Sequence, residues 1–198
     1  MLNTNICLTK GVGDSAIRIS QAIAKKYDSF FTLNDQDCYP HITIYMTKFP
    51  IKNLDSIQEE LEETIRNMAK FKISLTETYA NPNTFIGIHC KKDDVLTHLH
   101  ETIVNNLNKY REGLTPEEDP TFLSESQKTN LLKYGYIDAF ENYWPHLTIS
   151  RLKTFDEANQ AKEEIKVENT EFIVTHIGLF VVGENGSAKK LIKLFELK

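Results

Sequence analysis

The sequence predicts an α+β protein that forms a single domain over residues 1–198, and three observations support this prediction. Strand and helix patterns alternate along the chain, and the order strand, helix, strand and further hairpin occurs twice. The chain has 198 residues, which fits one domain at about 100–200 residues per domain. Hydrophobic residues make up 40% and charged residues 26%, as in ordinary globular proteins.

The first half of the chain alternates strand and helix patterns. Asp14 or Ser15 can cap a helix after the first strand, because either side chain can accept a hydrogen bond from the first helical turn. Apolar residues recur at steps of three and four from Leu54 to Met68, which predicts the clearest amphipathic helix of the chain. β-branched and aromatic residues indicate the strands, which we expect over residues 5–10, 39–46, 71–75 and 84–90.

The second half begins with an amphipathic helix over residues 95–107, after an acidic cap at Asp93 and Asp94. From Tyr110 to Lys128 the pattern gives way to Gly, Pro, Glu and Ser, which predicts a surface loop. The remaining elements, in chain order, are a short helix around Leu131, a strand over 143–151, a helix over 156–165 and strands over 171–182 and 190–197.

Composition excludes several classes of protein. The net charge of −5 disfavours a protein that coats long duplex nucleic acid, since such affinity comes from neutralising phosphates. No run of roughly 18 apolar residues predicts a membrane span, and the first residues lack the basic and apolar regions of a secretory signal. The odd set of cysteines, Cys7, Cys38 and Cys90, does not suggest a disulfide framework. We therefore expect a cytoplasmic protein and a monomer.

One pentapeptide is nearly repeated. Residues 40–44 read Pro-His-Ile-Thr-Ile, and residues 145–149 read Pro-His-Leu-Thr-Ile. A third His-x-Thr, from His100 to Thr102, lies in the predicted helix 95–107. Residues two apart on a helix point about 200° apart, so this third copy cannot line one site. The two strand copies are therefore the candidates for chemistry.

The strand context gives the two motifs their chemical meaning. Side chains alternate along a strand, so His41 and Thr43 should share one face, and His146 and Thr148 should share another. Two imidazoles can act as base and acid in the cleavage of a phosphoester, and the unperturbed pKa of an imidazole is near 6.5. The threonine hydroxyls can donate to the phosphoryl oxygens. We expect these four residues to be catalytic, with no metal and no cofactor.

Two His-x-Thr motifs with apolar flanks, about a hundred positions apart, resemble those of the 2H phosphoesterase superfamily. This superfamily includes 2′-5′ RNA ligase-like proteins, cyclic nucleotide phosphodiesterases and RNA-end-processing enzymes. The run 146–151 is similar to the HxTLxR form of the RNA-ligase-like branch, whereas the stretch 110–140 is longer than in compact members. The resemblance implies a single bilobed, pseudo-twofold α+β domain over residues 1–198, in which antiparallel sheets line a central groove with helices outside.

Five further residues near the motifs are candidates for substrate binding. Tyr45 and Ser150 lie on the histidine face of their strands if alternation persists. Tyr143 and Trp144 could stack a nucleobase or pack in the core. The resemblance suggests that Arg151 touches phosphate or base, although strict alternation points it away from Thr148 unless a bulge turns it.

The resemblance implies a metal-independent hydrolase that acts on 2′,3′-cyclic phosphates or 2′-5′ linkages of nucleotides or RNA ends, with ligation as a possible reverse reaction. Degradation of 2′-5′ oligoadenylates or cyclic oligonucleotide signals is a second enzymatic alternative. A non-catalytic module that binds nucleotides or RNA ends in the same groove is the alternative from another class. The acidic loop around residues 117–119 is either a solvated surface or a lid that selects substrates.

Overall fold

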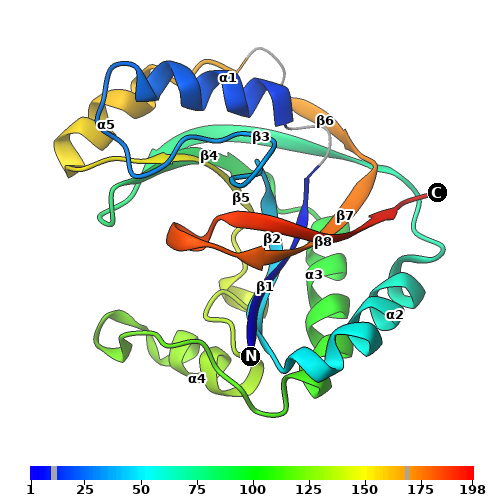
Figure 1. Cartoon of the computed structure of the whole chain (residues 1–198). Helices are drawn as coiled ribbons and strands as arrows, with labels where there is room; N and C mark the ends of the chain where they lie inside the picture. The colour runs from blue at the N-terminus through cyan, green and yellow to red at the C-terminus, as the bar shows by residue number, and fades with distance from the viewer. Residues whose placement is uncertain (10–12, 168–169) are drawn as a thin grey trace.

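The computed structural model describes residues 1–9, 13–167 and 170–198. In these residues, eight antiparallel strands form one curled sheet in the order β6-β3-β4-β5-β2-β1-β7-β8 (Figure 1). Helices cover its outer side, so the α+β class expected from the sequence is confirmed. The strands are β1 (Leu2–Leu8), β2 (Ile42–Phe49), β3 (Phe71–Ala80), β4 (Phe85–Cys90), β5 (His146–Arg151), β6 (Glu171–Val174), β7 (His176–Val182) and β8 (Ala188–Glu196).

The helices are amphipathic, and each buries its apolar side. On the clearest of them, α2, the buried residues are Ile57, Leu61 and Ile65 at steps of four, as the sequence predicts. The α-helices are α1 (Gly13–Ala24), α2 (Leu54–Ile65), α3 (Asp94–Leu107), α4 (Glu125–Tyr134) and α5 (Phe155–Glu163). Short 3₁₀ turns are η1 (Ile51–Asn53), η2 (Asn108–Arg111), η3 (Pro120–Phe122), η4 (Phe140–Asn142) and η5 (Glu184–Gly186).

The sheet has two halves that meet at β2 and β5. The first lobe contains β2, β1, β7 and β8, and the second contains β5, β4, β3 and β6. The two central strands pair only at Ile42 and Leu147, which are the middle residues of the two His-x-Thr motifs. Both side chains are buried, at 0% and 2% exposure. The fold therefore joins its lobes through the backbone of the two motifs.

The helices pack across the lobes in a crossed arrangement. Helix α1 leaves the first lobe after β1 and packs against β5 of the second lobe, where α5 also covers β3 and β4. Helix α3 leaves the second lobe after β4 and packs against β2 of the first lobe, with α2 alongside it. This exchange is the pseudo-twofold arrangement that the sequence resemblance implies, and it is visible in Figure 1.

Several element boundaries differ from those predicted. Strands β2 and β5 begin later than predicted, after the proline of each motif. Proline has no N–H to donate to a sheet, so it does not take part in the hydrogen-bonded strand. The predicted strand 171–182 is interrupted at Thr175, because β6 pairs with β3 in one lobe and β7 pairs with β1 in the other. The predicted strand 71–75 continues to Ala80. Lys10, the expected end of the first strand, lies outside the described residues.

The predicted loop 110–128 overlaps the end of η2, contains η3, and includes the first residues of α4. Ser124 forms a capping box with Gln127 at the start of α4, which satisfies otherwise free N–H groups of the first turn. Gly135 ends this helix with φ of 63°, a left-handed conformation that glycine adopts without strain. In the described part of the chain, no helix is both long and apolar enough for a membrane span.

His100 is a fully buried link between α3, β2 and the segment before β5. Its Nδ1 lies 2.6 Å from the carbonyl of Ile44, and its Nε2 accepts a hydrogen bond of 2.8 Å from the Phe140 N–H. A carbonyl can only accept, so Nδ1 carries the proton and the ring is neutral. Burial lowers the pKa of His100 to about 4. The third His-x-Thr copy therefore has a structural role.

The low pKa of His100 predicts a loss of stability in acid. The unfolded chain binds a proton at this residue near pH 6.5, whereas the folded chain binds it near pH 4. The free energy of unfolding should therefore fall as pH decreases from 6.5 to 4, and His100 should contribute on the order of 3 kcal/mol of this fall. Denaturant unfolding across this pH range measures it. His100→Gln keeps a donor and an acceptor but does not titrate, so an unchanged pH dependence in that variant would contradict the prediction.

Candidate active site

The two motifs present the same side chains to the same side of the sheet. His41, Thr43, His146 and Thr148 are all half-buried, while Ile42, Ile44, Leu147 and Ile149 are buried in the core. The expected alternation therefore holds through both motifs. Because β2 and β5 meet at the middle residue of each motif, the two histidines lie at the junction of the lobes. Coulomb repulsion from His41 contributes to the lowered pKa of His146.

Both histidine rings are held in the same way. Nδ1 of His41 lies 2.8 Å from the carbonyl of Tyr39, and Nδ1 of His146 lies 2.9 Å from the carbonyl of Trp144. Each carbonyl can only accept, so each Nδ1 carries a proton. In the neutral form of each ring, Nε2 is consequently the free base. The backbone thus fixes one tautomer at both positions and leaves Nε2 for chemistry.

The surroundings favour neutral imidazoles. Burial lowers the pKa of His41, and the hydrogen bond to Tyr39 opposes that shift. Burial lowers the pKa of His146 to about 4, with further lowering from His41 and from His89 on the neighbouring strand. His89 and His146 are directly opposite each other in the β4–β5 ladder. Both catalytic candidates therefore favour the neutral form in the free protein, and His146 stays neutral down to about pH 4.

A β-bulge follows each motif. In β2, Cys7 pairs with Thr43 and Ile6 pairs with Tyr45, so Ile44 is the extra residue. In β5, the corresponding extra residue is Ile149, because no residue of β4 pairs with it. The bulges occupy the same place in the two lobes. Each one shifts the alternation by one residue, and this changes where all the later side chains of the strand point.

The bulges make two predictions wrong. Tyr45 and Ser150 were expected on the histidine face, but both are fully buried. The Tyr45 hydroxyl donates to the carbonyl of Tyr134 at 2.6 Å, and the Ser150 hydroxyl donates to the carbonyl of Phe31 at 3.3 Å. These two side chains stabilise the core behind the strands and do not line the groove.

The same shift brings Arg151 to the motif side of β5, where it is half-buried. Its Nη1 donates to Asn185 in the β7–β8 turn at 2.7 Å, and its Nε donates to the carbonyl of Asn83 at 3.1 Å. The guanidinium also lies over the rings of Phe30 and Phe85, 4.8 and 4.9 Å from their centroids. Arg151 therefore ties the β7–β8 turn to the second lobe, beside the motifs.

The aromatic pair before the second motif has two separate roles. Tyr143 is 3% exposed, stacks on His100 at 4.0 Å and donates from its hydroxyl to the carbonyl of Thr43 at 3.2 Å. It is a core residue, so the nucleobase-stacking alternative is wrong for Tyr143. Trp144 is half-buried and stacks on His146 at 3.9 Å, with 17° between the rings. This contact fixes one face of the His146 imidazole.

Each threonine hydroxyl has a partner from outside its motif. Asn5, a fully buried residue of β1, donates from Nδ2 to Thr43 Oγ1 at 3.1 Å. The proton of that hydroxyl is thus free for another acceptor. The hydroxyl of Tyr79 lies 3.4 Å from Thr148 Oγ1. A Cβ at Gly87 would lie 2.8 Å from the Tyr79 hydroxyl and 2.3 Å from the carbonyl of Leu147, so glycine is needed for this approach.

Asn5 and Tyr79 were not recognised in the sequence. The polar Asn5 just before the apolar run Ile6–Leu8 is the one local signal for its role. Tyr79 lies on an alternating strand and carries no such signal. Gly87 lies opposite Tyr79 in the ladder. A glycine there indicates close backbone approach, but it does not predict which group the tyrosine hydroxyl contacts.

Three adjoining hollows form a groove along the motif side. The central hollow, of about 30 Å³, is lined by both His41 and Thr148 and has room for a water molecule. It shares Phe31, Cys38, Asn185 and Ser187 with a hollow of about 360 Å³. It shares Gly186 with a cavity of about 500 Å³ on the α4 side. In the described ranges, no three His, Cys, Asp or Glu residues are grouped as metal ligands.

The fold, with its crossed helices around a two-lobed antiparallel sheet, is that of the 2H phosphoesterase class. The 2′-5′ RNA ligase superfamily matches residues 15–186, so the chain belongs to this superfamily. No curated protein sequence matches the chain.

Solved structures show the same fold at low identity. TT0787 of Thermus thermophilus is 13% identical with a TM-score of 0.61, over 99% of this chain and 98% of that one. E. coli LigT complexed with 3′-AMP is 11% identical with a TM-score of 0.61, over 100% and 98%. The MHV ns2 PDE domain is 14% identical with a TM-score of 0.50, over 100% of both chains.

The environment of His146 gives a prediction for its titration. NMR of the imidazole should give a pKa of about 4 for His146. His89→Gln should raise that pKa, because it removes a like charge on the neighbouring strand. His98→Gln, on an outer face of α3, is the matched control and should leave it unchanged. A His146 pKa near 6.5 in the wild-type protein would contradict the described burial.

Proposed function

We propose that this protein is a metal-independent phosphodiesterase in which His41 and His146 act as an acid–base pair on one phosphate. The single observation that supports this most strongly is the mirrored geometry of the two motifs. Each motif presents a free Nε2 and a threonine hydroxyl from a strand fixed at the lobe junction. The acid and the base of a hydrolysis must reach opposite sides of the phosphorus, and one histidine from each lobe would meet this requirement.

The proposed step is in-line attack of water on phosphorus. His146 starts neutral, as its low pKa favours, and takes a proton from water at Nε2 while the new P–O bond forms. His41 starts protonated beside the bound phosphate anion and gives its Nε2 proton to the leaving ribose oxygen as the old P–O bond breaks. The two rings then exchange protons with solvent and return to their starting states. The Nδ1–H bonds to Tyr39 and Trp144 stay in place throughout.

The threonines stabilise the charge that develops on the phosphoryl oxygens. Thr43 is prepared for this role, because Asn5 occupies its oxygen and leaves its proton to donate. Thr148 shares a hydrogen bond with Tyr79, which holds the hydroxyl near the His41 hollow. The partners of each threonine come from the other strands of its own lobe. The phosphate would thus be held by hydroxyls fixed in advance.

The substrate class we propose is a nucleotide or short RNA with a 2′,3′-cyclic phosphate or a 2′-5′ linkage. Membership of the 2′-5′ RNA ligase superfamily supports this class. LigT has been solved with 3′-AMP, with NADP+ and with phosphate, and the chain shares its fold. Ligation would be the reverse of the same step. Cys7, Cys38 and Cys90 are buried free thiols, which supports a reducing, cytoplasmic setting.

Removal of either histidine should abolish most turnover. His41→Ala and His146→Ala should each lower kcat by about 10²–10⁴-fold, the range for a positioned acid or base. Thr43→Ala and Thr148→Ala should each cost about 1–3 kcal/mol of transition-state stabilisation. The rate constants are measured with 2′,3′-cyclic nucleotides in EDTA.

The wild-type pH profile of kcat/KM should be bell-shaped, with its acid limb near the pKa of about 4 of His146.

The product identifies the bond that is cut. A panel of 2′,3′-cyclic mononucleotides, a 2′-5′ diadenylate and a short RNA with a cyclic end is incubated in EDTA, and chromatography separates 2′- from 3′-phosphate products. A folded His41→Ala, His146→Ala double variant is the control. Full activity in that variant would overturn the mechanism. Nucleotide binding without turnover in the wild-type protein would instead identify the non-catalytic module.

A further inference from the structure

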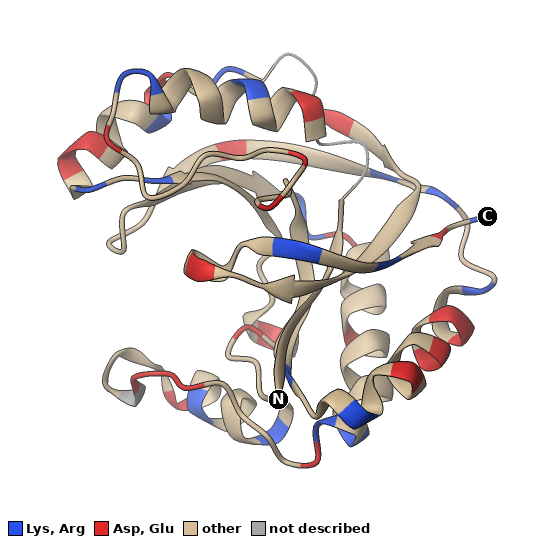
Figure 2. Ribbon diagram, in the orientation of Figure 1, with Lys and Arg blue, Asp and Glu red and all other residues tan. Residues whose placement is uncertain are grey.

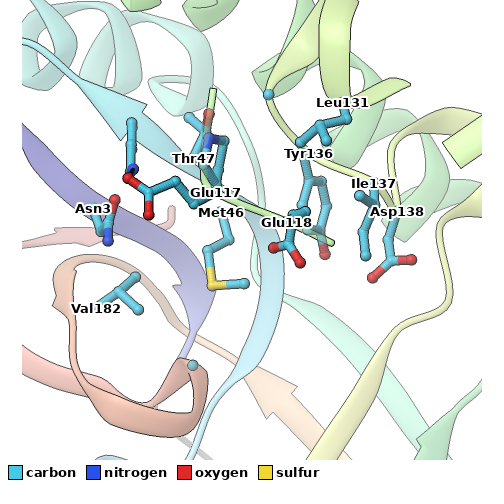
Figure 3. Close-up of a pocket in the computed structure, with 14 residues that line it drawn as sticks. Asn3, Met46, Thr47, Glu117, Glu118, Leu131, Tyr136, Ile137, Asp138 and Val182 are labelled. Carbon is cyan, nitrogen blue, oxygen red and sulfur yellow. Dashed lines mark ion pairs between the residues drawn. The ribbon is translucent and has the colours of Figure 1, made fainter. Parts of the chain in front are cut away.

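The cavity beside α4 is lined by apolar walls and carboxylates. It has a volume of about 500 Å³, within the range of small-ligand sites. Figure 3 shows Glu118 and Asp138 on the side nearest Tyr136 and Ile137, across the cavity from Asn3 and Val182. Acidic residues also mark the chain that leads into α4 in Figure 2. The other apolar lining residues are Met46, Pro116 and Leu131.

The cavity adjoins the hollow lined by His41 and Thr148. Gly186, in the β7–β8 turn, borders both this cavity and the hollow lined by His41 and Thr148. Met46 lines the cavity three residues after Thr43, about 10 Å further along β2 at about 3.3 Å per residue. The bulge at Ile44 turns Met46 to this side of the strand. A group attached to a phosphate at the histidines can therefore reach the cavity.

The polar lining favours a ligand that donates hydrogen bonds. Three carboxylates and one ammonium, Lys48, line the cavity, and Lys48 lies 3.8 Å from the exposed Glu117. The net charge of this lining is negative, so it would repel a second phosphate group of the ligand. Thr47, 1% exposed, also lines the cavity, and its Oγ1 has no hydrogen-bond partner in the described part of the chain. A buried hydroxyl without a partner points to an unfilled polar position.

Asp138 is influenced by Trp144, the aromatic residue that stacks on His146. The side-chain N–H groups of Trp144 and Gln127 favour the ionised form of the Asp138 carboxylate and partly oppose the effect of burial on its pKa. Burial raises the pKa of Asp138 to about 6, and the nearby charge of Glu118 adds to the shift. The group is still mainly ionised at pH 7. Asp138 is thus an ionised acceptor in the cavity lining, close to the residue that stacks on His146.

Among nucleobases, guanine fits this lining best. Its pairing edge carries two adjacent donors, N1–H and the 2-amino group, which a carboxylate can accept together. Adenine and cytosine place an acceptor nitrogen beside their amino group, and uracil places carbonyls on both sides of its N–H. We propose that the cavity binds a guanine base, which donates to the carboxylates of Glu118 and Asp138. The proposal rests on the proposed function, because the base would belong to the nucleotide whose phosphate lies at the histidines.

Inosine tests the proposal, since hypoxanthine differs from guanine only by the missing 2-amino group. The wild-type protein should hydrolyse 2′,3′-cyclic GMP with a kcat/KM about tenfold or more above that for 2′,3′-cyclic IMP, the ratio expected for one hydrogen bond to a charged group. Glu118→Gln with Asp138→Asn should reduce this ratio to about threefold or less. Glu112→Gln makes the same kind of charge change at a residue outside the cavity lining and should leave the ratio unchanged.

A binding measurement separates this proposal from the proposed function. Trp144 is the single tryptophan of the chain and influences the pKa of Asp138, so its fluorescence reports on a ligand near that carboxylate. Guanosine should change this fluorescence with an affinity at least about fivefold above that of inosine, whether or not any phosphodiester is cut. Absence of catalysis with this binding preference would overturn only the proposed function. Equal response to guanosine and inosine, or a kcat/KM ratio retained in the double variant, would overturn the guanine proposal.

Discussion

The rest of the site depends on the pairing of Ile42 with Leu147. This is the contact at which the two central strands, and hence the two lobes, are hydrogen-bonded neighbours. Since it falls at the middle residue of each motif, the flanking histidines and threonines must lie on the side of the sheet opposite the two buried side chains. A one-residue slip of either strand would turn its histidine into the core. The register of one contact therefore decides whether the two motifs can act together.

A second layer of buried groups holds that register. His100 and Tyr143 stack on each other, and they bind the carbonyls of Ile44 and Thr43. Both come from elements that precede β5, so the second half of the chain fixes the backbone of the first motif. Trp144 supports the second motif, because its carbonyl and its ring both contact the His146 imidazole. The site is rigid where chemistry is proposed, and its supports lie in the sheet and in α3.

The sequence was sufficient to predict the fold class and the shared face of the histidine and threonine in each motif. Period-two alternation is a local property, so the faces of His41 and His146 could be deduced from the neighbouring residues. The bulges at Ile44 and Ile149 could not be deduced, since they depend on how β1 and β4 pair with the motif strands. For that reason the predictions for Tyr45 and Ser150 were wrong. Asn5 was missed for a similar reason, because its partner Thr43 lies 38 residues away.

The central claim is that both motifs surround one phosphate, and a phosphate titration followed by NMR tests it most directly. Specifically labelled imidazoles report the Nε2 environment of His41 and His146 as inorganic phosphate is added. We predict that both Nε2 signals shift with the same dissociation constant, and that the pKa of at least one ring rises in the complex because the anion favours the imidazolium. A shift of only one histidine, or two shifts with different dissociation constants, would contradict the claim that the two strands form one site.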